Sequence, residues 1–161
     1  MKHLRFWIVF GVIGMLAAVG SVAFSHPEEA GDRAFRGGSY LVTFQDSTGN
    51  FASRAVITLH DDQTMAVADS GQGGPTFFFT SQLGSWKPTG PRRAVGRTID
   101  FNYPPDPAAA RLDYSLSFTR DHSQVTGTGT LISFPLENSD PLGSGGTVVG
   151  TFSFEGELIT P

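Results

Sequence analysis

The chain has 161 residues, no cysteine and a formal net charge of −4 at pH 7. The lack of cysteine excludes disulfide bonds and cysteine-ligated metals, so core packing alone has to stabilise the fold. An acidic chain also lacks the clustered Lys and Arg that phosphates require. This argues against nucleic acid and anionic membrane surfaces as partners.

The first 25 residues have the order of an export signal. Lys2 and Arg5 precede an apolar run over residues 6–20, and small residues occupy most of positions 21–25. This order is typical of a secretory signal peptide, and the small residues permit cleavage before Phe24 or before His26. We therefore expect residues 1–25 to be removed and the remaining chain to be exported, either to a periplasm or to the medium.

An uncleaved anchor is the alternative interpretation of the same segment. Residues 6–24 approach the roughly 20 residues that cross a bilayer as a helix. In that case the chain would contact the membrane only through this segment. With or without cleavage, the basic residues in front direct the rest of the chain out of the cytoplasm.

The remainder divides into a short leader and one domain. Residues 26–37 are charged at first and show no periodicity, which predicts a mobile leader. Residues 38–161 have the length of a single domain. Loss of Lys2 and Arg5 with the signal changes the formal net charge to −6.

The domain alternates apolar and polar residues between turns rich in Gly, Pro, Asn and Asp. Such period-two segments predict strands, and no window has helical spacing. The expected strands cover residues 39–45, 51–59, 64–68, 76–80, 83–88, 92–103, 111–120, 125–134 and 147–159. Short hairpin connections favour an all-β, antiparallel up-and-down barrel of about eight strands. A two-sheet sandwich is the alternative.

Two triplets carry a resemblance to a known family. Gly38-Ser39-Tyr40 opens the domain, and Gly84-Ser85-Trp86 lies near its middle. A glycine followed by any residue and a large aromatic resembles the lipocalin (calycin) signature. Together with the hairpin at residues 60–64, the stretch 84–92 also resembles small exported bacterial lipocalin-like proteins, and the allene oxide cyclase-type barrel is a related architecture. The resemblance implies that Trp86 closes the barrel floor and that the glycine lets two backbones approach.

Eight aromatic residues fall on the apolar faces of the expected strands and are the candidate ligand-binding residues. If the sheet closes, these rings converge and either fill the interior or line a pocket. They are Tyr40, Phe44, Phe101, Tyr103, Tyr114, Phe118, Phe152 and Phe154.

The sequence therefore predicts an exported barrel that binds a small apolar or amphipathic molecule in an aromatic-lined interior. One alternative is a cofactor-free cyclase or isomerase of the allene oxide cyclase-barrel type. Another is a structural envelope protein whose core is filled. No motif for a metal, a phosphate or a dinucleotide is present, so we expect neither cofactor nor metal.

Three further groups have two interpretations each. The run Phe77-Phe78-Phe79 is either a strand covered on both sides or an apolar rim at a barrel mouth. Arg92, Arg93 and Arg97 form either surface ion pairs or an anion-binding pocket. His60 and His122, in turns beside aspartates, are expected to be solvated rather than a metal site.

Several acidic residues could serve acid–base chemistry. The alternation places Asp100 on the face of its strand opposite Phe101 and Tyr103, and Asp113 opposite Tyr114. The same alternation turns Glu155 and Glu157 away from the apolar face, towards solvent.

We predict that the exported protein begins at Phe24 or His26, because small residues stand at the third and first positions before each cut. Intact-mass measurement of the protein recovered outside the cytoplasm tests this. A membrane-held form that retains Met1 would establish the anchor instead.

Overall fold

The computed structural model describes residues 37–73 and 78–161. The expected signal peptide, residues 1–25, lies outside the described residues. The same is true of the expected leader, residues 26–37, apart from Gly37. All described residues belong to one unit, Gly31–Pro161. None of them forms a helix long and apolar enough to cross a membrane.

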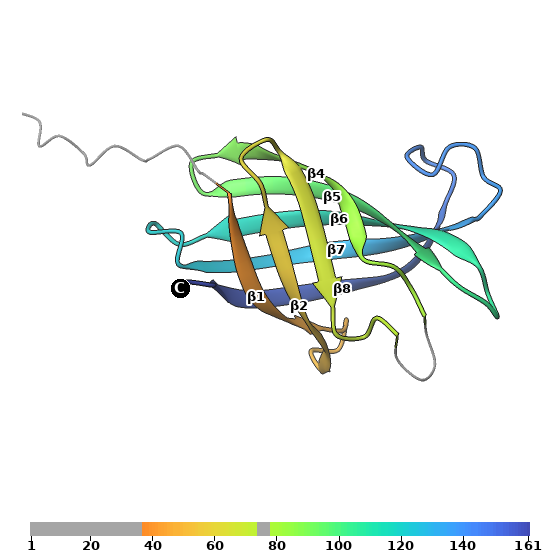
Figure 1. Ribbon diagram of the computed structural model, residues 1–161, viewed down its shortest axis with the longest axis horizontal. Helices are drawn as coiled ribbons and strands as arrows, with labels where there is room; N and C mark the ends of the chain where they lie inside the picture. Colours follow the sequence, from red (N-terminus) through yellow and green to blue (C-terminus); the bar gives the residue numbers. More distant parts are fainter. Residues whose placement is uncertain (1–36, 74–77) are drawn as a thin grey trace, which may run out of the picture. The chain divides into compact units, whose positions relative to one another are not determined.

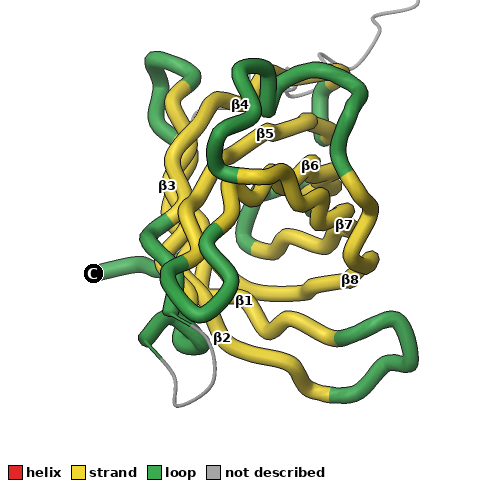
Figure 2. Tube along the Cα trace, turned by 90° about the vertical axis from the view of Figure 1, so that its right-hand side faces the viewer, coloured by secondary structure: helices red, strands yellow, loops and turns green. Residues whose placement is uncertain are grey.

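Eight antiparallel strands follow one another around a closed barrel (Figure 1, Figure 2). They are β1 (Gly38–Gln45), β2 (Phe51–Leu59), β3 (Thr64–Asp69), β4 (Gln82–Gly90), β5 (Arg93–Asn102), β6 (Ala108–Phe118), β7 (Gln124–Pro135) and β8 (Thr147–Leu158). The sheet closes where β8 pairs with β1. The expected up-and-down barrel is confirmed, and the sandwich is excluded because neither edge of the sheet is left unpaired.

The strand expected at residues 76–80 does not form in the described part of this segment. Phe79 makes only an isolated bridge with Asn102. Backbone hydrogen bonds from Thr80 to Phe101 and from Tyr103 to Phe78 hold this short segment beside the end of β5, and β4 itself begins at Gln82.

Three hairpin turns are held by an aspartate side chain that folds back on the turn. Each carboxylate accepts hydrogen bonds from the amide and hydroxyl of a residue two positions later, in the pairs Asp46–Thr48, Asp62–Thr64 and Asp121–Ser123. The hydroxyl and amide donors hold the pKa values of all three carboxyls below their usual range. These are the turns that the sequence predicted at residues 46–50, 60–63 and 121–124.

One end of the barrel is a closed floor. Trp86 is buried there, and its indole Nε1 donates to the carbonyl of His60 at 2.9 Å. Nearby, the Tyr40 hydroxyl donates to the carbonyl of His122 at 3.1 Å, and burial raises the pKa of Tyr40 to about 12. Gly84 permits the close approach of β4 to β5, because an added Cβ would overlap the carbonyl of Arg97.

Above the floor, aromatic rings fill the interior by packing over glycines. Phe154 and Phe152 on β8 face Gly127 and Gly129 on β7, and a Cβ at either glycine would overlap the ring. The two phenylalanines also meet Phe44 and Tyr114 edge-on, with ring centroids 5.1–6.1 Å apart. Edge-to-face contacts at this spacing are favourable, so the middle of the barrel is a packed core.

The prediction that Phe101 and Tyr103 face the interior is wrong. Phe101 is 49% exposed and Tyr103 is 53% exposed. On β5 the inward positions are the small or polar residues Ala94, Gly96, Thr98 and Asp100. Large rings from β1, β6 and β8 already occupy the interior, which leaves β5 room for small side chains and turns its larger apolar set outward.

Replacement of Trp86 by alanine should lower the free energy of unfolding by about 3–5 kcal/mol, because it removes a large buried ring and its hydrogen bond. Urea denaturation followed by circular dichroism measures the change. Phe51→Ala is the matched control, since Phe51 is 66% exposed and should cost little. A loss below about 1 kcal/mol at Trp86 would contradict its role in the floor.

Candidate functional site at the barrel mouth

The end of the barrel opposite the floor is open and partly polar. Because the strands alternate in direction, the connections at residues 46–50, 103–107 and 136–146 gather there, together with residues 70–73 and 78–81. A hollow of about 900 Å³ at this end is lined by strand ends and by connection residues such as Gly71, Phe79 and Pro105, and a smaller cavity of about 150 Å³ lies beside it. Ser53 and Asp69 line both spaces, so the two adjoin at these residues.

The larger hollow has mostly apolar walls. Ala110 and Leu131 come from the inward faces of β6 and β7, and Phe79 closes the side next to β5. The polar residues of the lining are Ser53, Asp69, Asn102, Asp106, Ser133 and Thr147. Apolar walls with a few placed polar groups are typical of small-molecule sites.

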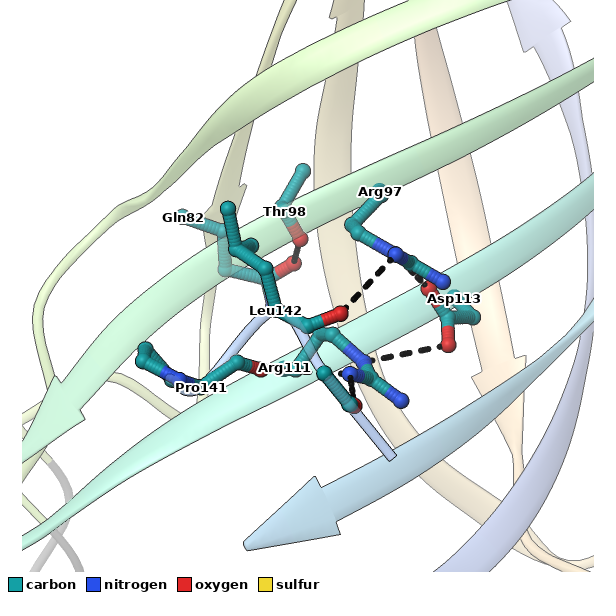
Figure 3. A network of polar contacts seen from close by, with 8 residues as sticks. Gln82, Arg97, Thr98, Arg111, Asp113, Pro141 and Leu142 are labelled. Atoms are coloured by element: carbon teal, nitrogen blue, oxygen red, sulfur yellow. Dashed lines mark hydrogen bonds and ion pairs between the residues drawn. The ribbon is translucent and has the colours of Figure 1, made fainter. Parts of the chain in front are cut away.

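A buried amide organises the polar side of this end. The Oε1 atom of Gln82 accepts hydrogen bonds from the hydroxyls of Tyr114, at 2.6 Å, and Thr98, at 3.0 Å. Figure 3 shows the Gln82–Thr98 contact beneath the ribbon of the barrel wall. Since Oε1 is the acceptor for both hydroxyls, Nε2 is the donor end of this amide, and no hydrogen bond joins it to a described residue. Gln82 lines the smaller cavity, where this donor can serve a ligand.

Two carboxyl groups lie next to this amide. Asp69 accepts from the Ser53 hydroxyl at 2.9 Å and from the Gly71 amide at 2.7 Å. Asp100 is 4% exposed, and its Oδ1 has no hydrogen-bond partner. Burial, and to a lesser extent the charge of Asp69, raise the pKa of Asp100 to about 7.

The basic side chains of the neighbouring strands lie on the outer wall. Arg97 and Arg111 both pair with Asp113, at 2.5 and 3.2 Å (Figure 3). Arg92, Arg93 and Arg97 are all exposed. They therefore lie on the surface and do not form an anion-binding pocket inside the barrel. Asp69 and Asp100 have no compensating cation on the described inward faces of the strands.

A loop anchors the outer wall beside the mouth. Arg111 donates to the carbonyls of Pro141 and Gly143, and Arg97 donates to that of Leu142. The Arg111 guanidinium also lies 5.3 Å from the ring centre of Phe134, which is fully buried. These contacts hold residues 141–143 against the outer face of β6, at the end of the barrel where the mouth lies. Figure 3 shows Pro141 and Leu142 beside the two arginines.

Six of the eight candidate ligand-binding residues face the interior, but they are not all at the mouth. Phe44 and Phe152 line the smaller cavity. Tyr40 and Phe118 pack together at the floor, with ring centroids 5.6 Å apart. The remaining inward residues, Tyr114 and Phe154, are buried in the middle layer.

The other sequence candidates are spread over the surface. Phe78 is half exposed and Phe79 lines the larger hollow, while Phe77 lies outside the described residues. His60 is exposed, and His122 contacts Phe118. The described part of the chain contains no group of three or more His, Asp or Glu able to hold a metal. Glu155 and Glu157 are exposed, as expected.

Sequence reasoning did not select Gln82, Ser53 or Asp69, and it considered Asp100 only as one of several acids. A signal for two of them existed. Along a strand, every second side chain lies on the same face. Gln82 and Gly84 therefore share a face with Trp86, which the resemblance had placed in the interior. Thr98 lies opposite Gly84, and the same rule then places Asp100 inside.

The protein is therefore a closed, eight-stranded antiparallel up-and-down barrel with a partly polar mouth. Comparison with protein-family models, curated proteins and solved structures finds no match in any of the three.

We predict that Asp100→Asn raises stability more at high pH than at low pH. A carboxyl whose pKa rises from 3.8 when unfolded to about 7 when folded destabilises the native state increasingly as pH rises through that window. The stability gained by Asp100→Asn should thus grow by about 3–4 kcal/mol between pH 4 and pH 8.

Urea denaturation at several pH values tests this expectation. Tyr114→Phe is the control, because it removes a neighbouring hydroxyl but no group that titrates in this range. Its stability difference from the wild type should stay constant with pH. Parallel stability curves for Asp100→Asn and the wild type would contradict the prediction.

Proposed function

We propose that this protein is an exported, lipocalin-like barrel that binds a small amphipathic molecule at its mouth. The observation that carries the proposal is the hollow of about 900 Å³ between the strand ends. This volume lies within the range of roughly 300–1,000 Å³ that is usual for small-molecule sites. The apolar part of the ligand would lie along Ala110 and Leu131, and its polar part would face Asp69 and Gln82.

The packed middle layer determines how deep such a ligand could reach. Phe44, Phe152, Phe154 and Tyr114 fill the barrel below the mouth, so the aromatic residues would form the base of the site rather than its walls. A ligand would therefore enter between the loops and stop at Phe44 and Phe152. This revises the location expected from the sequence but keeps the class of ligand.

A cofactor-free isomerase or cyclase is the second candidate function. It is supported by Asp100, a buried carboxyl whose raised pKa would let it exchange a proton near neutral pH. Binding would be the first step of that reaction as well. The two functions therefore share a site and differ in whether the ligand is changed.

We expect an uncharged, environment-sensitive dye such as N-phenyl-1-naphthylamine to bind the folded protein with one-to-one stoichiometry. Ser133→Trp should weaken binding at least tenfold, because Ser133 is half-buried on the inward face of β7 and lines the hollow. Fluorescence titration measures the dissociation constant. Thr128→Trp, on the exposed outer face of the same strand, is the matched control.

Circular dichroism establishes that each variant is folded. If Ser133→Trp does not fold, Thr147→Trp replaces it, since Thr147 is exposed at the rim of the same hollow. Failure of the folded wild type to bind the dye, or equal binding by the mouth variant and the Thr128→Trp control, would overturn the proposed site. The first result would favour the structural envelope protein, and the second would mean that the dye binds at another place.

A further inference from the structure

We infer that the mouth selects ligands that carry a protonated amine, with Asp69 as the group that contacts the ammonium and Asp100 as a second, buried negative group behind it. This inference rests on the proposed binding function and narrows its ligand to one chemical class. It predicts that an alkylammonium binds better than an alcohol or a carboxylate with the same chain.

The first argument is the unbalanced charge of the site. Asp69 lines both the larger hollow and the smaller cavity. Along β2, β5 and β6, the residues Arg54, Arg97 and Arg111 alternate with inward positions and therefore lie on the outer wall. Asp69 accepts hydrogen bonds from Ser53 and Gly71, but no cation faces it from these inward positions. An ammonium group of the ligand would provide the missing cation.

The second argument is the unused hydrogen-bonding capacity of Asp100. Asp100 is only 4% exposed, and its Oδ1 accepts no hydrogen bond. Asp100 pairs with Ala110, which lines the hollow, and lies on the same side of the sheet as Gln82, which lines the cavity. Buried acceptors without donors are rare in folded proteins. Asp100 itself lines neither space, so it would act on the ligand through its charge, from behind Asp69.

The third argument concerns the groups that surround Asp100. Ser53 on β2, Gln82 on β4, Thr98 on β5 and Tyr114 on β6 are neutral near pH 7, and Asp69 on β3 is the neighbouring charge. A ligand carboxylate would meet two acidic side chains that line the hollow, Asp69 and Asp106, and be repelled. A hydroxyl could accept one hydrogen bond from Gln82 but would leave the acidic charge unbalanced.

Ionisation of Asp100 adds a dependence on pH. Its pKa of about 7 means that the empty site gains negative charge between pH 5.5 and pH 8. An alkylamine, like the lysine side chain, stays protonated up to about pH 10. Affinity for the ammonium should therefore increase as pH rises, whereas affinity for a neutral alcohol should not.

Displacement of N-phenyl-1-naphthylamine by octylammonium, octanol and octanoate tests the inference at pH 8 and about 150 mM salt, where long-range attraction is screened. We expect octylammonium to bind at least tenfold more tightly than octanol, and octanoate to bind most weakly. Asp69→Asn and Asp100→Asn should each weaken octylammonium binding about tenfold, and each should weaken octylammonium binding more than octanol binding. The control Glu155→Gln removes an exposed charge from the outer wall and should change neither.

The outcomes separate this inference from the proposed function. If the folded protein binds neither the dye nor any of the three compounds, the proposed function fails. If the dye binds but octanol or octanoate competes as well as octylammonium, only the selectivity for amines is overturned. Unchanged octylammonium affinity in both Asp→Asn variants, or affinity that is equal at pH 5.5 and pH 8, would also overturn it.

Discussion

The interior of this barrel depends on the fit of Phe152 and Phe154 over two glycines of the neighbouring strand. Gly127 and Gly129 lie opposite the two rings, and a side chain at either position would occupy the space that the rings take. The rings in turn contact Phe44 on β1 and Tyr114 on β6. One packed layer thus connects four strands, including the pair that closes the sheet. Aromatic rings laid over glycines also fix the register of neighbouring strands.

This layer divides the barrel into a filled lower part and a partly polar upper part. Below it, Tyr40 and Trp86 satisfy their polar atoms with the carbonyls of His122 and His60, so the floor is both apolar and fully hydrogen-bonded at these side chains. Above it, Gln82 joins Thr98 and Tyr114, and Asp100 keeps an oxygen without a donor. The upper part therefore retains a local cost to stability, which is a pattern common at functional sites.

The outer wall supports the mouth from the side. Arg111 is buried between the ring of Phe134 and the loop carbonyls of Pro141 and Gly143, while its Nε pairs with Asp113. A guanidinium can serve all these partners at once because its donors spread over one plane. The loop between β7 and β8 is consequently held against β6, and one rim of the mouth has a defined position although it is built from a Gly- and Ser-rich segment.

The sequence by itself determined eight of the nine expected strands and the hairpin turns, and it favoured the barrel over the sandwich. Alternation of period two and turn residues such as Asp46, Asp62 and Asp121 are local features, whereas closure depends on the pairing of β8 with β1. Alternation does not say which face of a strand lies inside when both faces carry apolar residues. On β5 the larger set, with Ile99 and Phe101, faces outward, and Thr98 and Asp100 face inward. Only the tertiary structure decided this, because the rings of β1, β6 and β8 compete for the same enclosed volume and leave β5 the space that remains.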